Sequence, residues 1–337
     1  MLKQVLVGNS GLRSSQIALG TMTFGEGRDW GCSADEAMDI LSRFVEAGGT
    51  TIDTAPNYAN GGSEKIIGRF ASGKRDELVL STKYTASSTK TPLAGGNSRR
   101  SMVQSVEASL KRLDTDRIDL LWLHFWDFTT PLDEILRAAD DLTRAGKILY
   151  FGLSDTPAWL ASRAVTIAEL RNLAPVVAIQ LEYNVASRGV ETDLLPMAEN
   201  LGLSAFCWAP LAAGALTDGT ARKRNSGKRL PSYVQTARDG LASIAAKTGI
   251  ASHHLALLWL LGSGRNLIPI VGARTSDQLT EMVQAISASL DAEIIDEISG
   301  LATPKLPFPT KLIESDYLRT FALGTPERYD KPWPSRC

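Results

Sequence analysis

Eight short apolar runs, separated by stretches with helical periodicity, constrain the fold of this chain more than any other feature. They begin at residues 16, 50, 78, 118, 148, 176, 203 and 267 and read QIALG, TTID, LVLSTK, IDLLWLH, ILYFGLS, VVAIQ, LSAFCW and LIPIVG. Val, Ile and Leu dominate them, as in strands whose two faces are both covered. Repeated strand–helix units of this kind predict an α/β fold built on a parallel sheet.

Helices are predicted between the runs, over residues 34–48, 63–71, 98–113, 133–145, 157–171, 190–201, 234–261 (broken near Gly249) and 275–289. The first helix begins with a capping box, Ser33 followed by Glu36, and its C-cap is the Gly48-Gly49 pair. Eight strands with eight helices predict closure into a single (β/α)8 TIM-barrel domain over residues 1–337. A doubly wound sheet is disfavoured because the first strand runs into GTMTFGEG, which lacks the GxGxxG spacing.

Three segments lie outside the repeat. Residues 3–16 predict a β-hairpin that turns at Asn9 to Gly11 and plugs the floor of the barrel. Residues 84–97 and 211–232 follow the third and seventh strands and are polar and Gly-rich, which predicts long functional loops on the C-terminal face. The tail from Ala302 onward is expected to pack over one end of the barrel, through aromatic residues that include Phe308, Tyr317, Phe321 and Trp333.

Composition excludes several classes of protein. The 36 basic residues nearly cancel the 37 acidic ones, so no global field attracts nucleic acid or an anionic membrane. Three widely spaced cysteines fit neither a disulfide framework nor a CxxC site, which favours a reducing compartment. The N-terminus lacks a signal-peptide pattern, and no apolar run is long enough to span a bilayer. We therefore expect a cytoplasmic protein with a small-molecule partner, and the oligomeric state stays open.

Polar side chains follow the strands at their predicted C-terminal ends, where barrel enzymes carry their chemistry. Those residues are Asp53, Tyr58, Lys83, His124, Ser154, Asp155, Gln180 and Trp208. In the acid–base set among them, a nearby Lys83 ammonium would lower the pKa of the Tyr58 phenol and make it a usable proton donor. Asp53 would pair with Lys83, and His124 would orient a carbonyl oxygen.

Each of these residues also has an ordinary structural explanation. An aspartate after a strand commonly caps a turn, and a lysine there is commonly solvated. A histidine within LLWLHFW can be a core residue, and a tyrosine can simply pack. The functional interpretation depends on all four members of the acid–base set meeting at one rim.

DTAPNY, STK, LH and GLS, in this order, resemble the aldo-keto reductases over nearly the whole chain. GTMTFG, GGNSRRSMVQSVEASLKRL, IDLLWLHFWD and FCWAPLAAGALTDG resemble the aryl-alcohol-dehydrogenase-like branch. The resemblance implies reversible, NADPH-dependent reduction of an aldehyde or ketone, with NADH as a possible substitute. It implies Tyr58 as general acid, tuned by Lys83 and Asp53, with His124 positioning the carbonyl.

The resemblance also implies the cofactor site. Ser154, Asp155 and Gln180 would hold the nicotinamide carboxamide, and Trp208 would stack on the ring. The pyrophosphate and adenosine-phosphate contacts would come from Leu211, Gly214, Leu216, Gly272, Arg274, Gln278 and Glu281, with Thr21 and Met22 also at the cofactor. Arg274, just before a helix N-terminus, suits a 2′-phosphate and favours NADPH. The alternative is that Arg274 is simply a surface arginine that binds no ligand.

Two residues depart from the family pattern. Asp155 stands where the family usually has Asn, and an ionised Asp cannot donate a hydrogen bond to the carboxamide oxygen. Met282 stands where the family often has an adenine-binding Asn. Aromatic residues predict a pocket for a bulky apolar or aromatic carbonyl compound, lined by Phe24, Trp30, Tyr84, Phe125 and Trp126.

Three rival functions remain open. Some barrels of this family are regulatory subunits that bind the cofactor with little turnover, and the complete acid–base set argues against that role. A Schiff-base aldolase would use Lys83. A metal-dependent hydrolase needs clustered ligands, but the chain has three histidines, and the adjacent His253 and His254 are predicted on different faces of a helix, so no metal site is expected.

Overall fold

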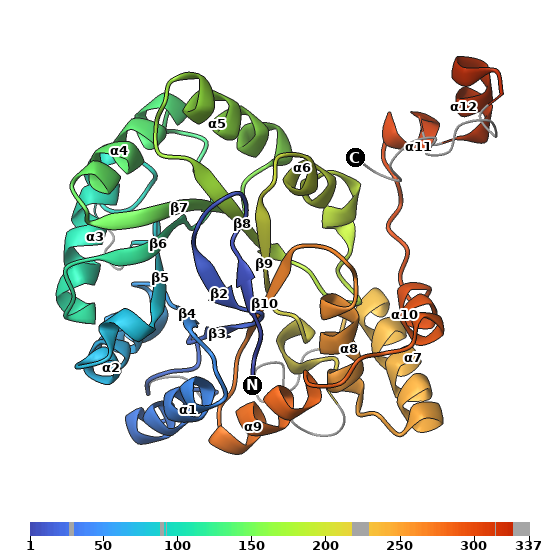
Figure 1. The fold of residues 1–337 in the computed structure, drawn as a ribbon, viewed down its shortest axis with the longest axis horizontal. Coiled ribbons are helices and arrows are strands. Elements are labelled where there is room, and N and C mark those ends of the chain that lie inside the picture. The colour runs from blue at the N-terminus through green and yellow to red at the C-terminus, as the bar shows by residue number, and fades with distance from the viewer. Residues whose placement is uncertain (27–29, 88–90, 92, 218–228, 314, 326–337) are drawn as a thin grey trace.

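The computed structural model describes residues 1–26, 30–87, 91, 93–217, 229–313 and 315–325. Eight parallel strands close into a barrel in chain order, from β3 round to β10, which pairs with β3 (Figure 1). The strands are β3 (Ala18–Gly20), β4 (Thr51–Asp53), β5 (Val79–Tyr84), β6 (Ile118–Leu123), β7 (Ile148–Ser154), β8 (Val176–Glu182), β9 (Ser204–Trp208) and β10 (Leu267–Val271). The predicted (β/α)8 barrel is confirmed. Each strand coincides with a predicted run, although β5 and β8 extend one and two residues beyond theirs.

Helices form a ring around the barrel (Figure 1). They are α1 (Ala34–Glu46), α2 (Gly62–Ala71), α3 (Arg99–Leu113), α4 (Leu132–Arg144), α5 (Ala158–Leu170), α6 (Leu194–Asn200), α7 (Ser232–Thr248), α8 (Ser252–Leu261) and α9 (Ser276–Ala285). The predicted helix 190–201 is divided into a 3₁₀ turn, Gly189–Thr192, and α6. A further helix, α10 (Ala292–Ser299), was not predicted.

The N-terminal hairpin closes the floor of the barrel, as predicted. Strands β1 (Gln4–Leu6) and β2 (Arg13–Ser15) pair antiparallel. Between them, Val7 and Leu12 are buried in the same cluster as the barrel-interior side chains of Trp122 and Phe206. The backbone N–H of Gly8 donates to Ser204 Oγ at 2.7 Å, at the first residue of β9. The hairpin thus seals the N-terminal end, and the opposite end stays available for a site.

Helix α1 begins as its sequence predicts but uses its acidic residue differently. The Ser33 hydroxyl accepts from the backbone N–H of Glu36 at 3.1 Å, which is one half of a capping box. The Glu36 carboxylate instead accepts from the backbone N–H of Ser276 at 2.6 Å, at the first residue of α9. Glu36 therefore ties the first helix of the barrel to the last helix of the repeat.

The predicted break near Gly249 separates α7 from α8. Gly249 has φ +72°, and its N–H caps α7 by donating to Ala245 O at 2.8 Å. A glycine adopts this left-handed conformation without the steric cost that a Cβ brings. No single helix in the described part of the chain is long and apolar enough to cross a membrane; α7 and α8 pass that test only as a pair, and they are bent by 98°.

The C-terminal tail does not pack as expected. After α10 the chain leaves the ring of helices, and α11 (Thr310–Ile313) and α12 (Asp316–Leu323) lie away from the barrel (Figure 1). Phe308, Tyr317 and Phe321 are 84%, 73% and 80% exposed. The aromatic residues of the tail suggested a packed cover, but Tyr317 stacks on Phe321 of its own helix instead. Trp333 lies outside the described residues.

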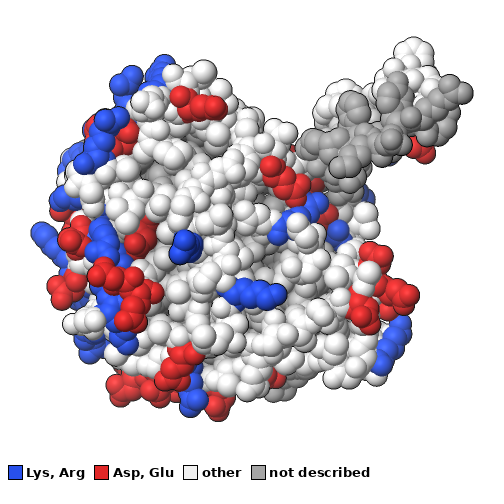
Figure 2. Space-filling view, in the orientation of Figure 1, with Lys and Arg blue, Asp and Glu red and all other residues white. Residues whose placement is uncertain are grey.

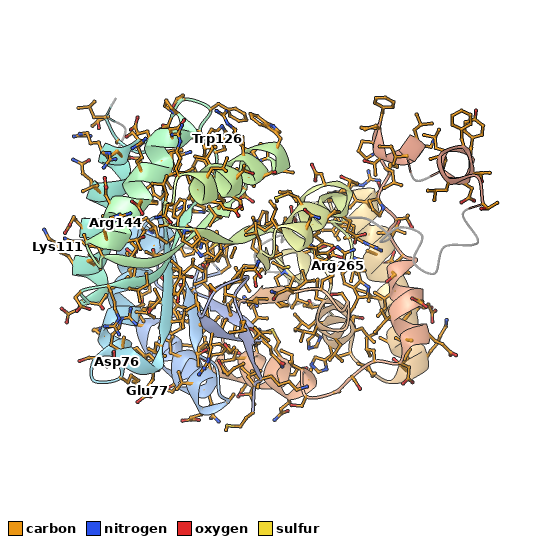
Figure 3. All side chains as sticks on the ribbon, turned by 45° about the horizontal axis from the view of Figure 1, so that its top comes forward. Asp76, Glu77, Lys111, Trp126, Arg144 and Arg265 are labelled. Carbon is orange, nitrogen blue, oxygen red and sulfur yellow. The ribbon has the colours of Figure 1, made fainter. Side chains whose placement is uncertain are left out.

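Charge is interspersed on the surface. Figure 2 shows acidic and basic side chains mixed around the edge of one face, with mostly uncharged side chains near its centre. Figure 3 labels Asp76, Lys111 and Arg144 on the outside of the barrel, and Arg144 pairs there with Asp140 at 2.7 Å. This face therefore shows no single-sign patch of the kind that attracts nucleic acid.

Candidate active site

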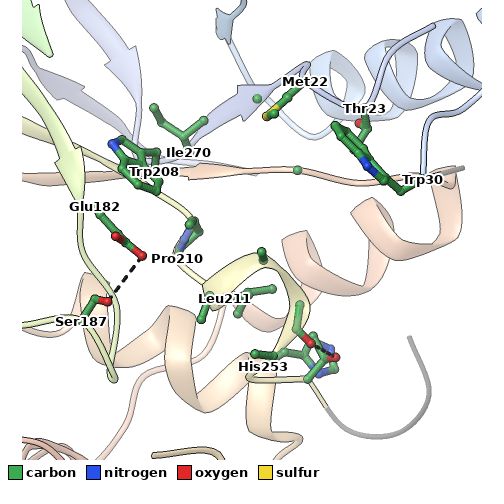
Figure 4. A pocket seen from close by; sticks show the side chains of 18 of the residues that line it. Met22, Thr23, Trp30, Glu182, Ser187, Trp208, Pro210, Leu211, His253 and Ile270 are labelled. Carbon is green, nitrogen blue, oxygen red and sulfur yellow. Dashed lines mark hydrogen bonds between the residues drawn. The ribbon is translucent and has the colours of Figure 1, made fainter. Parts of the chain in front are cut away.

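A pocket of about 920 Å³ opens where the strands end. The two long loops follow β5 and β9 on this face, as predicted, although 88–90, 92 and 218–228 lie outside the described residues. The predicted residues that line the pocket are Thr21, Met22, Trp30, Asp53, Tyr58, His124, Ser154, Asp155, Gln180, Trp208, Leu211, Gly214, Gly272, Arg274, Gln278 and Glu281. Figure 4 shows Trp208 and Ile270 at one end of this pocket in projection and His253 at the other.

Lys83 and Asp53 form a buried ion pair at the base of the pocket, from neighbouring strands. The Lys83 ammonium bonds the Asp53 carboxylate and donates to Thr54 O at 2.9 Å. Their residues are only 1% and 2% exposed. Burial alone would lower the pKa of Lys83, but the charges of Asp53 and Tyr58 outweigh it and raise that pKa. Lys83 is therefore held as a cation.

Tyr58 lies directly above this pair. It opens a 3₁₀ turn, Tyr58–Gly61, just after β4, in which Ala59 and Asn60 have positive φ. The Lys83 ammonium is 5.2 Å from the centre of the Tyr58 ring. Since Tyr58 also lines the pocket, its phenol stands between the buried cation and the space that a substrate would enter.

His124 follows β6 and faces the same pocket. Burial, together with the charge of Lys83, lowers the pKa of His124 to about 3. The imidazole is therefore neutral near pH 7, with one N–H donor and one acceptor nitrogen. The four members of the predicted acid–base set thus meet at one rim.

Two further polar residues, Gln180 and Ser154, lie beside the acid–base set on the pocket wall. Its side-chain amide donates to Asp53 Oδ1 at 3.1 Å, and Ser81 Oγ donates to the same oxygen at 2.8 Å. Ser154, at the end of β7, is 1% exposed, and its hydroxyl has no hydrogen-bond partner among the described residues. A buried, unsatisfied hydroxyl on a pocket wall is the kind of group that a ligand amide satisfies.

Asp155 and Trp208 lie next to Ser154. Asp155 has φ 41°, and its Oδ1 accepts from the indole N–H of Trp208 at 3.1 Å. Burial raises the pKa of Asp155, against the opposing effects of the Trp208 hydrogen bond and the Lys83 charge. Asp155, which stands where the family usually has Asn, therefore stays protonated to a higher pH than an ordinary aspartate. While protonated, its carboxyl can donate a hydrogen bond.

The loop after β9 lines the pocket and is held in shape by its own backbone hydrogen bonds. The N–H groups of Gly214 and Leu216 both donate to Leu211 O, at 2.9 and 3.2 Å. Leu216 itself is buried in the core and does not line the pocket. Thr21, on the other side, donates through its hydroxyl to Asp53 O at 3.0 Å, so it supports the strand that carries Asp53.

Arg274 and Gln278 lie at the start of α9. The backbone N–H of Arg274 donates to Gln278 Oε1 at 3.0 Å, and Thr275 Oγ1 caps the helix. The nearby N–H of Ser276 already has the Glu36 carboxylate as its acceptor. An anion at this end of the pocket would therefore have to compete with Glu36 for that helix N–H.

The predicted aromatic wall is only partly present. Trp30 lines the pocket, but Phe24 and Tyr84 are completely buried in the core between barrel and helices. Phe125 is exposed, and Trp126 packs against that core and contacts the Phe128 ring; Figure 3 labels Trp126 near the outer edge of the molecule. None of these four side chains lines the pocket.

Other pocket residues were not predicted. They are Thr23, Asn57, Glu182, Ser187, Pro210, Tyr233 and His253 among others. Glu182 lies two residues beyond Gln180 on β8, and a period-2 extension of that strand would have identified it. Its carboxylate accepts from Ser187 Oγ at 3.4 Å (Figure 4). Tyr233 and His253 come from the helices α7 and α8. The prediction considered only residues at the C-terminal ends of strands, so it missed them.

Comparisons with known proteins identify the family of this chain. The profile of the Aldo/keto reductase family matches residues 16–303. The chain is 34% identical to a norsolorinic acid reductase of Aspergillus flavus, over 92% of this chain and 83% of that protein. It is 33% identical to a putative aryl-alcohol dehydrogenase of Saccharomyces cerevisiae, over 93% and 90% of the two chains. The chain therefore belongs to the aldo/keto reductase family, NAD(P)H-dependent enzymes that act on carbonyl and alcohol groups.

Proposed function

We propose that this protein reduces an aldehyde or ketone to the alcohol with NADPH, using Tyr58 as the general acid. The observation that carries the proposal is the buried Lys83–Asp53 pair beneath Tyr58, at the base of the pocket. A buried cation is costly unless it is paired. Its placement 5.2 Å from a phenol ring is the arrangement that makes a tyrosine more acidic.

The roles of the four residues follow from their charges. The Tyr58 hydroxyl donates its proton to the carbonyl oxygen as negative charge develops there. The Lys83 ammonium stabilises the phenolate that remains, and Asp53 keeps Lys83 protonated. Neutral His124 donates a hydrogen bond to the same oxygen and orients it. The nicotinamide cofactor, when bound, supplies the hydride.

The pocket fits a nicotinamide on chemical grounds. Ser154 offers a buried hydroxyl without a partner in the described chain. Gln180 offers an amide, and Asp155 a carboxyl with raised pKa. Together they present the donors and acceptors that a carboxamide needs. The Trp208 indole, which lines the same wall, supplies an aromatic face beside the ring.

NADPH is proposed over NADH because of Arg274. Its guanidinium can form two parallel hydrogen bonds with a 2′-phosphate, and the residue lines the pocket with Gln278 and Glu281. NADH lacks that phosphate and would lose the interaction. NADH remains a slower substitute in this account.

An aromatic carbonyl compound is the proposed substrate class. Trp30 and Tyr233 line the pocket together with Met22, and a large apolar wall selects large apolar ligands. The relatives are described as reductases of norsolorinic acid and dehydrogenases of aryl alcohols.

We also propose a cytoplasmic location. Cys32 and Cys207 are free, buried thiols, which suits a reducing compartment.

A screen of aldehydes and ketones with each cofactor tests the function. We expect NADPH consumption that depends on the carbonyl compound, fastest with aromatic aldehydes, and slower consumption with NADH. Tight NADPH binding without turnover of any carbonyl compound would instead indicate a cofactor-binding regulatory subunit. Inactivation by borohydride with substrate would indicate a Schiff base on Lys83.

A further inference from the structure

We propose that His253, His254 and Glu281 form a binding site for a divalent transition-metal ion of the zinc class. The two histidines are in the first turn of α8, and Glu281 is on α9. The sequence predicted that the histidines diverge, because neighbouring helical residues point about 100° apart. Both instead reach the same carboxylate, so the expectation is corrected.

The distances match a coordination shell. His253 Nε2 is 3.2 Å and His254 Nε2 is 3.9 Å from Glu281 Oε1. One ligand atom from each residue lies within 4.8 Å of the other two. In a tetrahedral site with bonds of about 2.0–2.2 Å, ligand atoms lie roughly 3.3 Å apart. The His253–Glu281 pair is already near that separation, and the other ligand atoms lie no more than about 1.5 Å beyond it.

The donor set determines the class of ion. Two imidazoles and one carboxylate suit Zn²⁺, Co²⁺, Ni²⁺ and Cu²⁺, whereas Mg²⁺ and Ca²⁺ prefer oxygen ligands alone. Zn²⁺ binds to two histidines and one glutamate in well-known protein sites, where water completes the shell. Zinc is therefore the appropriate probe.

The surroundings hold the two histidines in place. Their rings contact each other edge to face, with 4.1 Å between centres and an angle of 61° between the ring planes. The two side chains are 14% and 20% exposed, and the Glu281 side chain is 55% exposed. The neighbouring Ser252 and Leu255 are buried and fix the start of α8. The site therefore has two positioned ligands and a third that can adjust and exchange water.

The site has a consequence for the pocket. His253 and Glu281 both line it, as do Arg274 and Gln278, and Gln278 lies one turn before Glu281 on α9. A zinc ion there would join α8 to α9 and withdraw Glu281 from any ligand at that end. Zinc is thus expected to weaken NADPH binding, an extension that rests on the proposed function.

Zinc binding is measured directly on the full chain without a polyhistidine tag, by equilibrium dialysis and metal analysis with zinc alone. We expect one zinc per chain, an affinity loss of at least about tenfold in Glu281→Gln, and loss of the site in the double variant His253→Gln with His254→Gln. Glu297→Gln is the matched control, because Glu297 is a partly exposed helical glutamate that pairs with Lys247. It should bind zinc as the parent does.

Circular dichroism and thermal unfolding establish that each variant is folded. Zinc binding that stays the same in the folded double variant would overturn the proposal, as would less than one zinc per chain at saturation. A second titration with NADPH tests the extension: zinc should raise the Kd for NADPH in the parent and not in the double variant. If NADPH fails to bind at all, the proposed function fails while the zinc result still decides the metal site.

Discussion

The indole Nε1 of Trp208 donates a 3.1 Å hydrogen bond to Oδ1 of Asp155, which joins the residue after β7 to the end of β9. The bond fixes the orientation of the carboxyl beside the proposed carboxamide site. Burial raises the pKa of Asp155, whereas this bond and the charge of Lys83 lower it. The protonated form donates a hydrogen bond, and the ionised form cannot.

Asp155→Asn should therefore remove a pH dependence. In the parent, a rise in pH through the raised pKa of Asp155 takes away the donor, so the KM for NADPH should increase. The Asn side chain keeps an N–H₂ donor at every pH, so the KM of the variant for NADPH should not change with pH. At high pH it should be about 2- to 10-fold lower than the KM of the parent. Initial rates across pH measure this, and equal slopes in both proteins would refute it.

Lys83→Met should be both inactive and unstable. It leaves Asp53 as a buried charge without its partner, which costs about 3–5 kcal/mol of unfolding free energy. Combining it with Asp53→Asn should restore much of that stability without restoring turnover, because the cation stays absent. Denaturant unfolding and steady-state rates measure the two effects. Turnover in the double variant near that of the parent would contradict the role of Lys83.

His124 should not titrate within the working range. Its pKa of about 3 is far below the usual histidine value, so between about pH 5 and 8 the imidazole stays neutral. His124→Asn should lower kcat/KM without changing the shape of its pH profile. An inflection near neutral pH that is present in the parent and absent in the variant would show that His124 ionises there.

Arg274→Ala should discriminate between the cofactors. Loss of charge-assisted hydrogen bonds to the 2′-phosphate is expected to raise the KM for NADPH about 10- to 100-fold. The KM for NADH should change little, because NADH carries no phosphate there. Equal effects on both cofactors would place the phosphate elsewhere.

The strands and their polar ends were predictable because local pattern determines them. The runs of Val, Ile and Leu located all eight strands. The strand ends pointed to Asp53 and His124, which line the pocket, and to Lys83, which pairs with Asp53 beneath it. The alternation of side chains along β5 also explains one error. Because Lys83 points into the barrel, its neighbour Tyr84 must point toward the helices, where it is buried.

The remaining errors involve contacts between segments that are distant in sequence. The convergence of His253 and His254 on Glu281 depends on how α8 and α9 pack, which periodicity does not specify. Glu36 satisfies an N–H of another helix, 240 residues away, instead of its own. The exposed aromatic residues of the tail show that composition alone does not specify a packing partner.

Tyr58→Phe tests the central claim most directly, because it removes one hydroxyl and little of the pocket. Turnover is followed with an aromatic aldehyde, and NADPH binding is followed by quenching of tryptophan fluorescence. The account predicts that kcat falls by about 10²- to 10⁴-fold while the Kd for NADPH stays within about twofold of the parent. A variant that binds NADPH normally and still reduces the aldehyde at the parent rate would contradict it.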